Sequence, residues 1–316
     1  MLFFPGYNEE LKEYCQKILK AKVDIWLIKS SPWALIYRLK TSKNDFVLKI
    51  GPEYNKGAGV SNELKAFLFL KKSGIANIPP LLHIGKFCKC DFFITAFLKD
   101  SGRYNSLELS RVFGKIHSLV RTSSNFSKVD FVLGILKSFR STFRFLKFSY
   151  CPLDIVNDIE QVLIKISKLI SNRRHLFSEN HTLSFINMDN NDNVIISKGR
   201  TYICDWHLSC FGDNAWDLAR LLSYYRIERM SFLLHYQKYT IEDEWLLRRT
   251  QLYEFLNKIL LILLYLTNSG TFRKDLFRIL VSKEKESKVL RRIYYQVARR
   301  RIHDIKQNFY EYLLNL

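Results

Sequence analysis

Short runs of apolar and β-branched residues, separated by polar turns, are the main pattern of the N-terminal part of the chain. Ser30-Ser31-Pro32 and Ser42-Lys43-Asn44 divide these runs, and both segments are rich in turn-forming residues. Runs of this length with such turns between them are typical of consecutive antiparallel strands. We therefore expect three strands, over 24–29, 34–39 and 45–50.

A helical pattern follows these strands. It opens at Ser61-Asn62, where either side chain can cap a helix, and it stops near Gly74. Two further strand patterns cover 81–84 and 92–97. The order is therefore three strands, one helix and two strands.

The pattern changes from about residue 106 to long helical repeats, of which 107–120 and 155–169 are the clearest. Two short strand patterns, 193–196 and 201–204, interrupt them, and the chain after Ala219 is again helical. The sequence thus predicts an α+β architecture. We expect a small sheet-containing lobe over 1–98 and a larger, mainly helical lobe over 99–316.

The composition and net charge of the chain indicate which classes of binding partner to expect. The chain has 316 residues, 47% of them hydrophobic, and 50 Lys and Arg against 30 Asp and Glu, a formal charge of +20. This balance favours anionic partners such as nucleotides, phosphorylated sugars, nucleic acid or anionic lipid surfaces.

The six cysteines show no paired CxxC spacing, so we expect free buried thiols rather than a zinc site. The N-terminus lacks a secretory pattern and the apolar run 259–266 is too short to span a bilayer, so we expect a cytoplasmic location.

Candidate chemistry lies between residues 187 and 219. Asp189 can accept a hydrogen bond from an acceptor hydroxyl, and Asn193 and Asp205 offer the oxygen ligands that Mg²⁺ prefers. Phosphoryl transfer needs such positioning and charge neutralisation more than covalent help. A run as polar as 189–193 is also what an ordinary turn looks like, and Asn191 competes with Asn193 for the metal-side amide.

The N-terminal part supplies candidates for nucleotide binding. Lys49 ends the third strand among apolar neighbours, and Glu63 near the start of the following helix can pair with it. Ser31 lies in the turn where a phosphate-covering loop is expected, although that turn contains no glycine. The run 92–97, which includes Thr95, is where an adenine ring can rest on apolar walls, and ordinary core is the alternative for its aromatic residues.

These residues resemble the aminoglycoside phosphotransferase and choline kinase family, which has a bilobal protein-kinase-like fold. The matching segments are Asn187-Met188-Asp189, Asn193, Ile203-Cys204-Asp205-Trp206, Gly212-Asp213 and Asp217-Leu218-Ala219. The resemblance implies ATP and Mg²⁺ as cofactors and Asp189 as the catalytic residue. It also implies that Asn187 replaces a bracing histidine, and that Asp217 is a structural anchor of the catalytic loop.

Three functions follow from this pattern. The first is a kinase that phosphorylates a hydroxyl of a small molecule. The second is a catalytically weak pseudokinase that binds nucleotide or a partner, because Asn187 and Met188 depart from the family pattern. The third is contact with an anionic surface through the basic C-terminal stretch around 291–301, although no nucleic-acid motif accompanies it, and a solvated face of a packed helix is the simpler interpretation.

Overall fold

The structure, a computed structural model, describes residues 7–31, 34–52, 59–102, 104–122, 126–147, 153–177, 182–189, 193–279 and 295–307. They fall into two compact units. The first lies within Met1–Val120, Ser184–Phe211 and Ile227–Ile241, and the second within Arg121–Leu183, Gly212–Arg226 and Glu242–Leu316. A lobe boundary at residue 98 stays a prediction.

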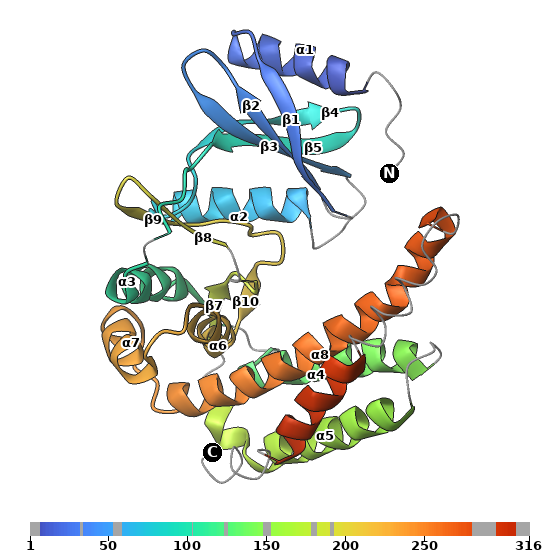
Figure 1. Cartoon of the computed structure of the whole chain (residues 1–316). Coiled ribbons are helices and arrows are strands. Elements are labelled where there is room, and N and C mark those ends of the chain that lie inside the picture. Colours follow the sequence, from blue (N-terminus) through green and yellow to red (C-terminus); the bar gives the residue numbers. More distant parts are fainter. Residues whose placement is uncertain are drawn as a thin grey trace. The chain divides into compact units, whose positions relative to one another are not determined.

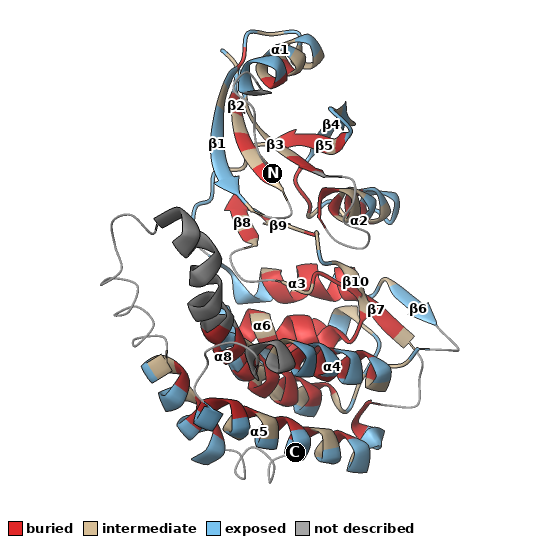
Figure 2. Ribbon diagram, turned by 90° about the vertical axis from the view of Figure 1, so that its right-hand side faces the viewer, coloured by how far each residue is buried: buried red, intermediate tan, exposed pale blue. Residues whose placement is uncertain are grey.

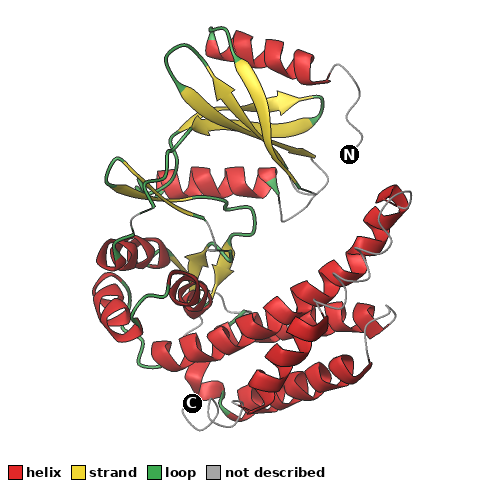
Figure 3. Ribbon diagram, viewed as in Figure 1, coloured by secondary structure: helices red, strands yellow, loops and turns green. Residues whose placement is uncertain are grey.

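A five-stranded antiparallel sheet lies in the first unit (Figures 1 and 3). Its strands are β1 (Asp24–Ser30), β2 (Leu35–Lys40), β3 (Asp45–Pro52), β4 (Leu81–Phe87) and β5 (Cys90–Ala96). Their order in the sheet is β1-β2-β3-β5-β4, and every neighbouring pair is antiparallel. The predicted order of three strands, a helix and two strands is confirmed.

The two faces of this sheet are covered by different helices (Figure 3). Leu48 and Ile50 of β3 pack with Leu11 and Cys15 of α1 (Tyr7–Leu19), a helix that the strand pattern did not predict. Successive strand residues point to opposite faces. Lys49 therefore points to the other face, which α2 (Val60–Lys72) covers.

The start of α2 differs from the expected cap. The residue before the helix is Gly59, with a φ of 82°, and among the described residues no side chain caps the helix. Ser61 instead contacts the carboxylate of Asp91, and Asn62 donates to the carbonyls of two residues near Asp205. The expectation that Ser61 or Asn62 caps the helix was wrong because long-range partners take both side chains.

The remaining elements of the first unit include α3 (Ser106–His117), α7 (Arg229–Tyr236) and η2 (Gln237–Tyr239). The helix predicted over 107–120 ends at His117. The predicted strands after residue 193 form an antiparallel pair, β8 (Val194–Ser197) and β9 (Arg200–Ile203), and its turn residues Lys198 and Gly199 have φ values of 49° and 73°. Such positive values suit a two-residue hairpin turn. A small sheet has the order β10 (Cys210–Gly212), β7 (Thr182–Ile186) and β6 (Val120–Thr122).

The second unit is helical. It contains α4 (Lys128–Lys147), α5 (Leu153–Asn172), η1 (Arg174–Phe177), α6 (Asn214–Tyr225) and α8 (Leu246–Ile279). The buried residues of α5 recur at helical spacing, so they form an apolar stripe, and exposed residues cover its other side (Figure 2). Among the described helices, none is long and apolar enough to cross a membrane.

The basic C-terminal stretch is partly described. Residues 295–307 are helical, and Ala298, Ile302 and Ile305 are buried there. Arg299 forms an ion pair with Asp154 of α5, at 3.1 Å. These contacts favour a packed helix with a solvated face, while Arg291 and Arg292 lie outside the described residues.

Candidate active site

Lys49 is the centre of a charged cluster in the first unit. Its Nζ lies 3.0 and 2.9 Å from the two carboxylate oxygens of Glu63, and 2.9 Å from Oδ1 of Asp205. The side chains of Lys49 and Glu63 are only 12% and 3% exposed, so their charges interact with little screening. Burial alone lowers the pKa of Lys49, but the charges of Glu63 and Asp205 outweigh it, and the net pKa is raised. The ammonium is therefore held in its charged form.

Glu63 depends on Lys49 for its charge. Burial raises the pKa of the Glu63 carboxyl, and the charge of Lys49 opposes that rise. α2 brings the carboxylate beneath the sheet face to which Lys49 points, and Phe67 of the same helix packs against Phe93 of β5, with ring centroids 5.4 Å apart. The predicted pairing of Lys49 with Glu63 is present.

Asp205 follows β9, and its two carboxylate oxygens have different surroundings. Oδ1 accepts hydrogen bonds from Lys49 and from Nδ1 of His207, at 2.9 and 2.8 Å. Burial alone raises the pKa of Asp205, but His207 and Lys49 outweigh it and hold the pKa below its usual range. Among the residues that the structure describes, none donates to Oδ2. An ionised oxygen without a protein donor is a suitable ligand for a divalent cation.

Asn187 connects the two halves of the predicted motif. Its side chain is fully buried, and Nδ2 donates to the carbonyls of Cys204 and Asp205, at 3.2 and 3.3 Å. Its Oδ1 accepts from the backbone N–H of Asp189, at 3.1 Å. One asparagine thus joins the segment of Asp189, the candidate base, to the segment of Asp205, the candidate metal ligand. The bracing role that the resemblance assigned to Asn187 stays a prediction.

Asn193 lies beside the same loop. Its Nδ2 contacts the carbonyl of Asp189, and its own carbonyl accepts from the N–H of Cys204, at 2.8 Å. Because Cys204 precedes Asp205, this backbone bond brings Asn193 next to the second metal-ligand candidate. Asn191, the competing amide, lies outside the described residues.

Two non-glycine residues of the site have a left-handed backbone. Met188 has a φ of 71° and Asp205 a φ of 57°. For residues other than glycine, a left-handed backbone conformation costs about 1–2 kcal/mol. Both strained residues adjoin the Asn187 bridge, and such strain is maintained only where neighbouring contacts fix the backbone.

The other two nucleotide candidates are placed differently. Thr95 pairs with Val47, as Phe93 pairs with Lys49, so its side chain shares the Lys49 face of the sheet and is buried there. Ser31 ends up in a tight turn, where its hydroxyl lies 3.1 Å from both the N–H and the carbonyl oxygen of Ala34. A phosphate contact by Ser31 stays a prediction.

Two residues of this site were not predicted from the sequence. His207 donates to Asp205, and Asn62 donates to the carbonyl of His207, at 3.0 Å. Burial lowers the pKa of His207, but the hydrogen bond to Asp205 outweighs it and raises the pKa overall. The position of His207 two residues after Asp205 was the available signal, because such a side chain can reach back to the carboxylate.

The tail of the motif lies in the second unit. Asp213 caps α6 by accepting from the N–H of Ala215, and both of its oxygens bind the guanidinium of Arg249, at 2.8 and 3.2 Å. Tyr253 donates to the same carboxylate, at 3.1 Å. Asp217 is fully buried in the first turn of α6, and its role as an anchor of the catalytic loop stays a prediction.

The cysteines are only partly as expected. Cys15 and Cys90 are buried, and burial raises the pKa of the Cys15 thiol to about 11. Cys88 is exposed, however, because it lies in the β4–β5 turn with a positive φ of 48°. Cys151 lies outside the described residues.

The five-stranded sheet, the helix beneath it and the lysine–glutamate pair have the arrangement of the protein-kinase-like fold, and solved structures of that fold match the chain along most of its length. One is a choline/ethanolamine kinase family protein from Mesorhizobium loti, with 14% identity, a TM-score of 0.62, and coverage of 97% of this chain and 98% of that one. Another is choline kinase from Cryptosporidium parvum Iowa II, with 14% identity, a TM-score of 0.61, and coverage of 95% and 97%.

A third match is spectinomycin phosphotransferase, solved with ADP and spectinomycin, with 14% identity, a TM-score of 0.60, and coverage of 91% of this chain and 93% of that one. No protein-family model and no curated protein sequence matches the chain. The α+β, protein-kinase-like fold expected from the sequence is confirmed, and at this identity the likeness concerns the fold.

Proposed function

We propose that the protein is a phosphotransferase of the aminoglycoside phosphotransferase and choline kinase family, which uses ATP and Mg²⁺ to phosphorylate a hydroxyl of a small molecule. The observation that supports this most directly is the position of Lys49, whose ammonium contacts Glu63 and Asp205 at once. A buried, charged lysine beside an ionised carboxylate is the pair that phosphates and their metal require. The solved structures of similar fold include kinases and an ADP complex, which agrees with nucleotide use.

Each candidate has a distinct role in this proposal. Lys49 binds the nucleotide phosphates, and Glu63 fixes its direction. Asp205, through Oδ2, and Asn193, through its amide oxygen, would hold Mg²⁺, which neutralises charge on the transferred group. Asp189 orients the acceptor hydroxyl and accepts its proton. Asn187 is a positioning residue, since it ties Asp189 to the backbone of Asp205.

The charge of the chain bears on the acceptor. Carboxylates are a common means of binding a cationic acceptor, and this chain has 30 acidic residues against 50 basic ones. We infer that a neutral or anionic acceptor, such as a sugar or a lipid-linked alcohol, suits the protein better than an aminoglycoside. The cytoplasmic location and the anionic-surface contact stay predictions.

A pseudokinase is the second candidate, because Asn187 and Met188 replace the bracing residues of the family. Binding of Mg²⁺ and ATP without transfer to any acceptor would favour it over an active kinase.

The test is phosphorylation of a panel of hydroxylated metabolites with Mg²⁺ and either ATP or GTP. Asp189→Asn removes the base and keeps the size of the side chain. Asp24→Asn is the matched control, because Asp24 is an exposed carboxylate of the same unit. Loss of a positioned base lowers rates by about 10²–10⁴-fold. An Asp189→Asn protein that is as active as the control would contradict the assignment.

A further inference from the structure

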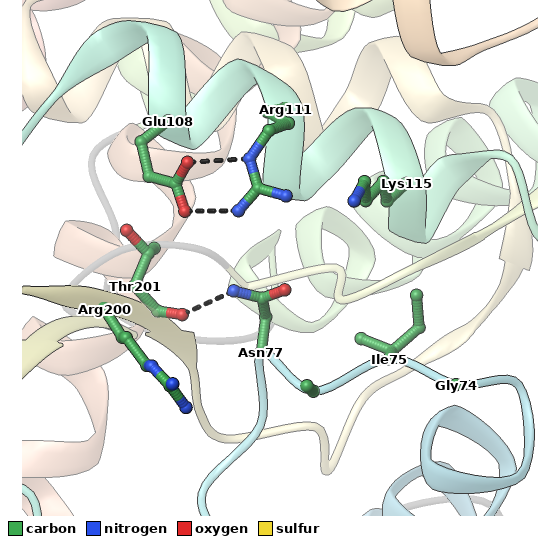
Figure 4. A pocket seen from close by; sticks show the side chains of 9 residues that line it. Gly74, Ile75, Asn77, Glu108, Arg111, Lys115, Arg200 and Thr201 are labelled. Atoms are coloured by element: carbon green, nitrogen blue, oxygen red, sulfur yellow. Dashed lines mark hydrogen bonds and ion pairs between the residues drawn. The ribbon is translucent and has the colours of Figure 1, made fainter.

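A cavity with several charged side chains in its lining lies in the first unit. Its volume is about 370 Å³, and the segment Gly74–Asn77, helix α3 and strand β9 form its walls (Figure 4). The lining side chains that matter here are Asn77, Glu108, Arg111, Lys115, Arg200 and Thr201. None of the three residues of the Lys49 cluster lines it.

Three of these side chains are cationic and one is a carboxylate. Glu108 binds one edge of the Arg111 guanidinium, with Nε and Nη2 donating at 2.7 and 2.6 Å. This fixes the guanidinium, and its remaining nitrogen points away from Glu108 toward the part of the cavity near Lys115 (Figure 4). Lys115 and Arg200 form no ion pair with any residue in the described part of the chain. The cavity therefore has an excess of positive charge, and it has N–H donors that are not engaged in ion pairs.

The walls of the cavity are held together by neutral hydrogen bonds. Asn77 donates through Nδ2 to the carbonyl of Thr201, at 2.8 Å (Figure 4). The carbonyl of Asn77 accepts from the N–H of Ile203, also at 2.8 Å. These bonds join the segment after α2 to β9, so the cations of α3 and β9 face a preformed concave wall rather than a loose surface. Preformed sites lose little conformational entropy when a ligand binds.

We propose that this cavity binds a small dianionic phosphate, either inorganic phosphate or the phosphate group of a small monoester. Arg111, Lys115 and Arg200 would donate charge-assisted hydrogen bonds, the strongest class available to an anion. A concave basic wall concentrates anions more effectively than a flat surface of the same charge. Small-molecule sites commonly have volumes of about 300–1,000 Å³, so the cavity admits more than a bare ion. The proposal is independent of the kinase assignment.

The test is calorimetric titration of the full chain with inorganic phosphate and, separately, with glycerol phosphate, in the absence of Mg²⁺. The double variant Lys115→Gln/Arg200→Gln removes two exposed cations of the cavity. Lys43→Gln/Lys65→Gln is the control, because it removes two exposed cations of the same unit outside the cavity. We expect the cavity variant to bind about ten-fold more weakly or worse, and the control to bind as the wild type does. Tighter binding of glycerol phosphate than of inorganic phosphate would identify a monoester as the ligand.

A charge-adding variant tests the same site without removing any contact. Ala76 is exposed and lines the cavity, so Ala76→Glu places a carboxylate among the cations, whereas Ser42→Glu adds one in the β2–β3 turn. Only Ala76→Glu should abolish phosphate binding. Absence of binding to the wild type, or equal losses in the cavity and control variants, would overturn the proposal. A titration repeated with saturating ADP separates this site from the proposed nucleotide site, because Lys115 and Arg200 should matter equally with and without ADP.

Discussion

Replacement of Arg249 by methionine should destabilise the second unit strongly. Arg249 and Asp213 are both 0% exposed in their side chains, and Asp243, the second partner, is 12% exposed. Methionine fills part of the space but leaves the buried carboxylate of Asp213 without its cation. Breaking a buried ion pair from one side costs about 3–5 kcal/mol, mostly because the remaining charge is desolvated and unpaired. We expect a loss of that size in the free energy of unfolding.

Arg299→Met is the matched control for this prediction. Arg299 also pairs with an aspartate of the second unit, but its side chain and that of Asp154 are 54% and 60% exposed. Exposed pairs of this kind contribute about 0–1 kcal/mol. Urea unfolding followed by tryptophan fluorescence, with linear extrapolation, measures both losses. Similar losses in the two variants would refute the reasoning.

A second variant isolates the cause. Asp213→Asn keeps the cap of α6, since asparagine caps helices as well as aspartate does, but it removes the charge. Combined with Arg249→Met, it should recover about 0.5–3 kcal/mol relative to Arg249→Met alone, the usual size of coupling between contacting residues. No recovery would mean that lost packing, rather than an unpaired carboxylate, explains the effect.

Two further predictions concern the backbone strain at Met188 and the loss of stability at low pH. Met188→Gly should be more stable than Met188→Ala by about 1 kcal/mol in urea unfolding, because only glycine relieves the left-handed φ, and equal stability of the two would remove the inferred strain. Burial raises the pKa of Asp243, but Arg249 outweighs burial and lowers it overall. The stabilisation that ionised Asp243 provides is therefore complete above the unfolded pKa of about 3.9, and it is lost as pH falls toward the pKa of the folded protein. The difference in unfolding free energy between wild type and Asp243→Asn should shrink below about pH 4. A difference that stays constant with pH would contradict this prediction.

The order of strands and helix along the N-terminal part of the chain, and the Lys49–Glu63 pair, were predictable because local signals determine them. Turn residues separate the apolar runs, and the strand alternation that buries Leu48 and Ile50 leaves Lys49 on the other face. α1 was missed although Leu11, Cys15 and Ile18 recur at helical spacing. Those positions are few, and most of the other residues of the helix are polar.

The rest of the candidate site depends on contacts that no short window of sequence contains. Arg249 reaches Asp213 across 36 positions, and Asn62 reaches the carbonyl of His207 across 145. A chain with 50 basic residues offers many partners for each carboxylate, so only the fold decides which arginine is buried. The same reason explains the wrong cap at Ser61 and Asn62, whose side chains bind partners distant in sequence.

Because side chains of β3 point alternately to the two faces of the sheet, the gene segment that encodes this strand tolerates substitutions better than insertions or deletions. Leu48 and Ile50 pack with α1 while Lys49 points to α2, so the lysine keeps its place only if the strand keeps its residue count. A single-codon insertion or deletion within β3 reverses the direction of every side chain beyond it, which would turn the ammonium into the core beside Leu11. The turn between β2 and β3 can absorb such a change because it is exposed, whereas the strand beside it cannot.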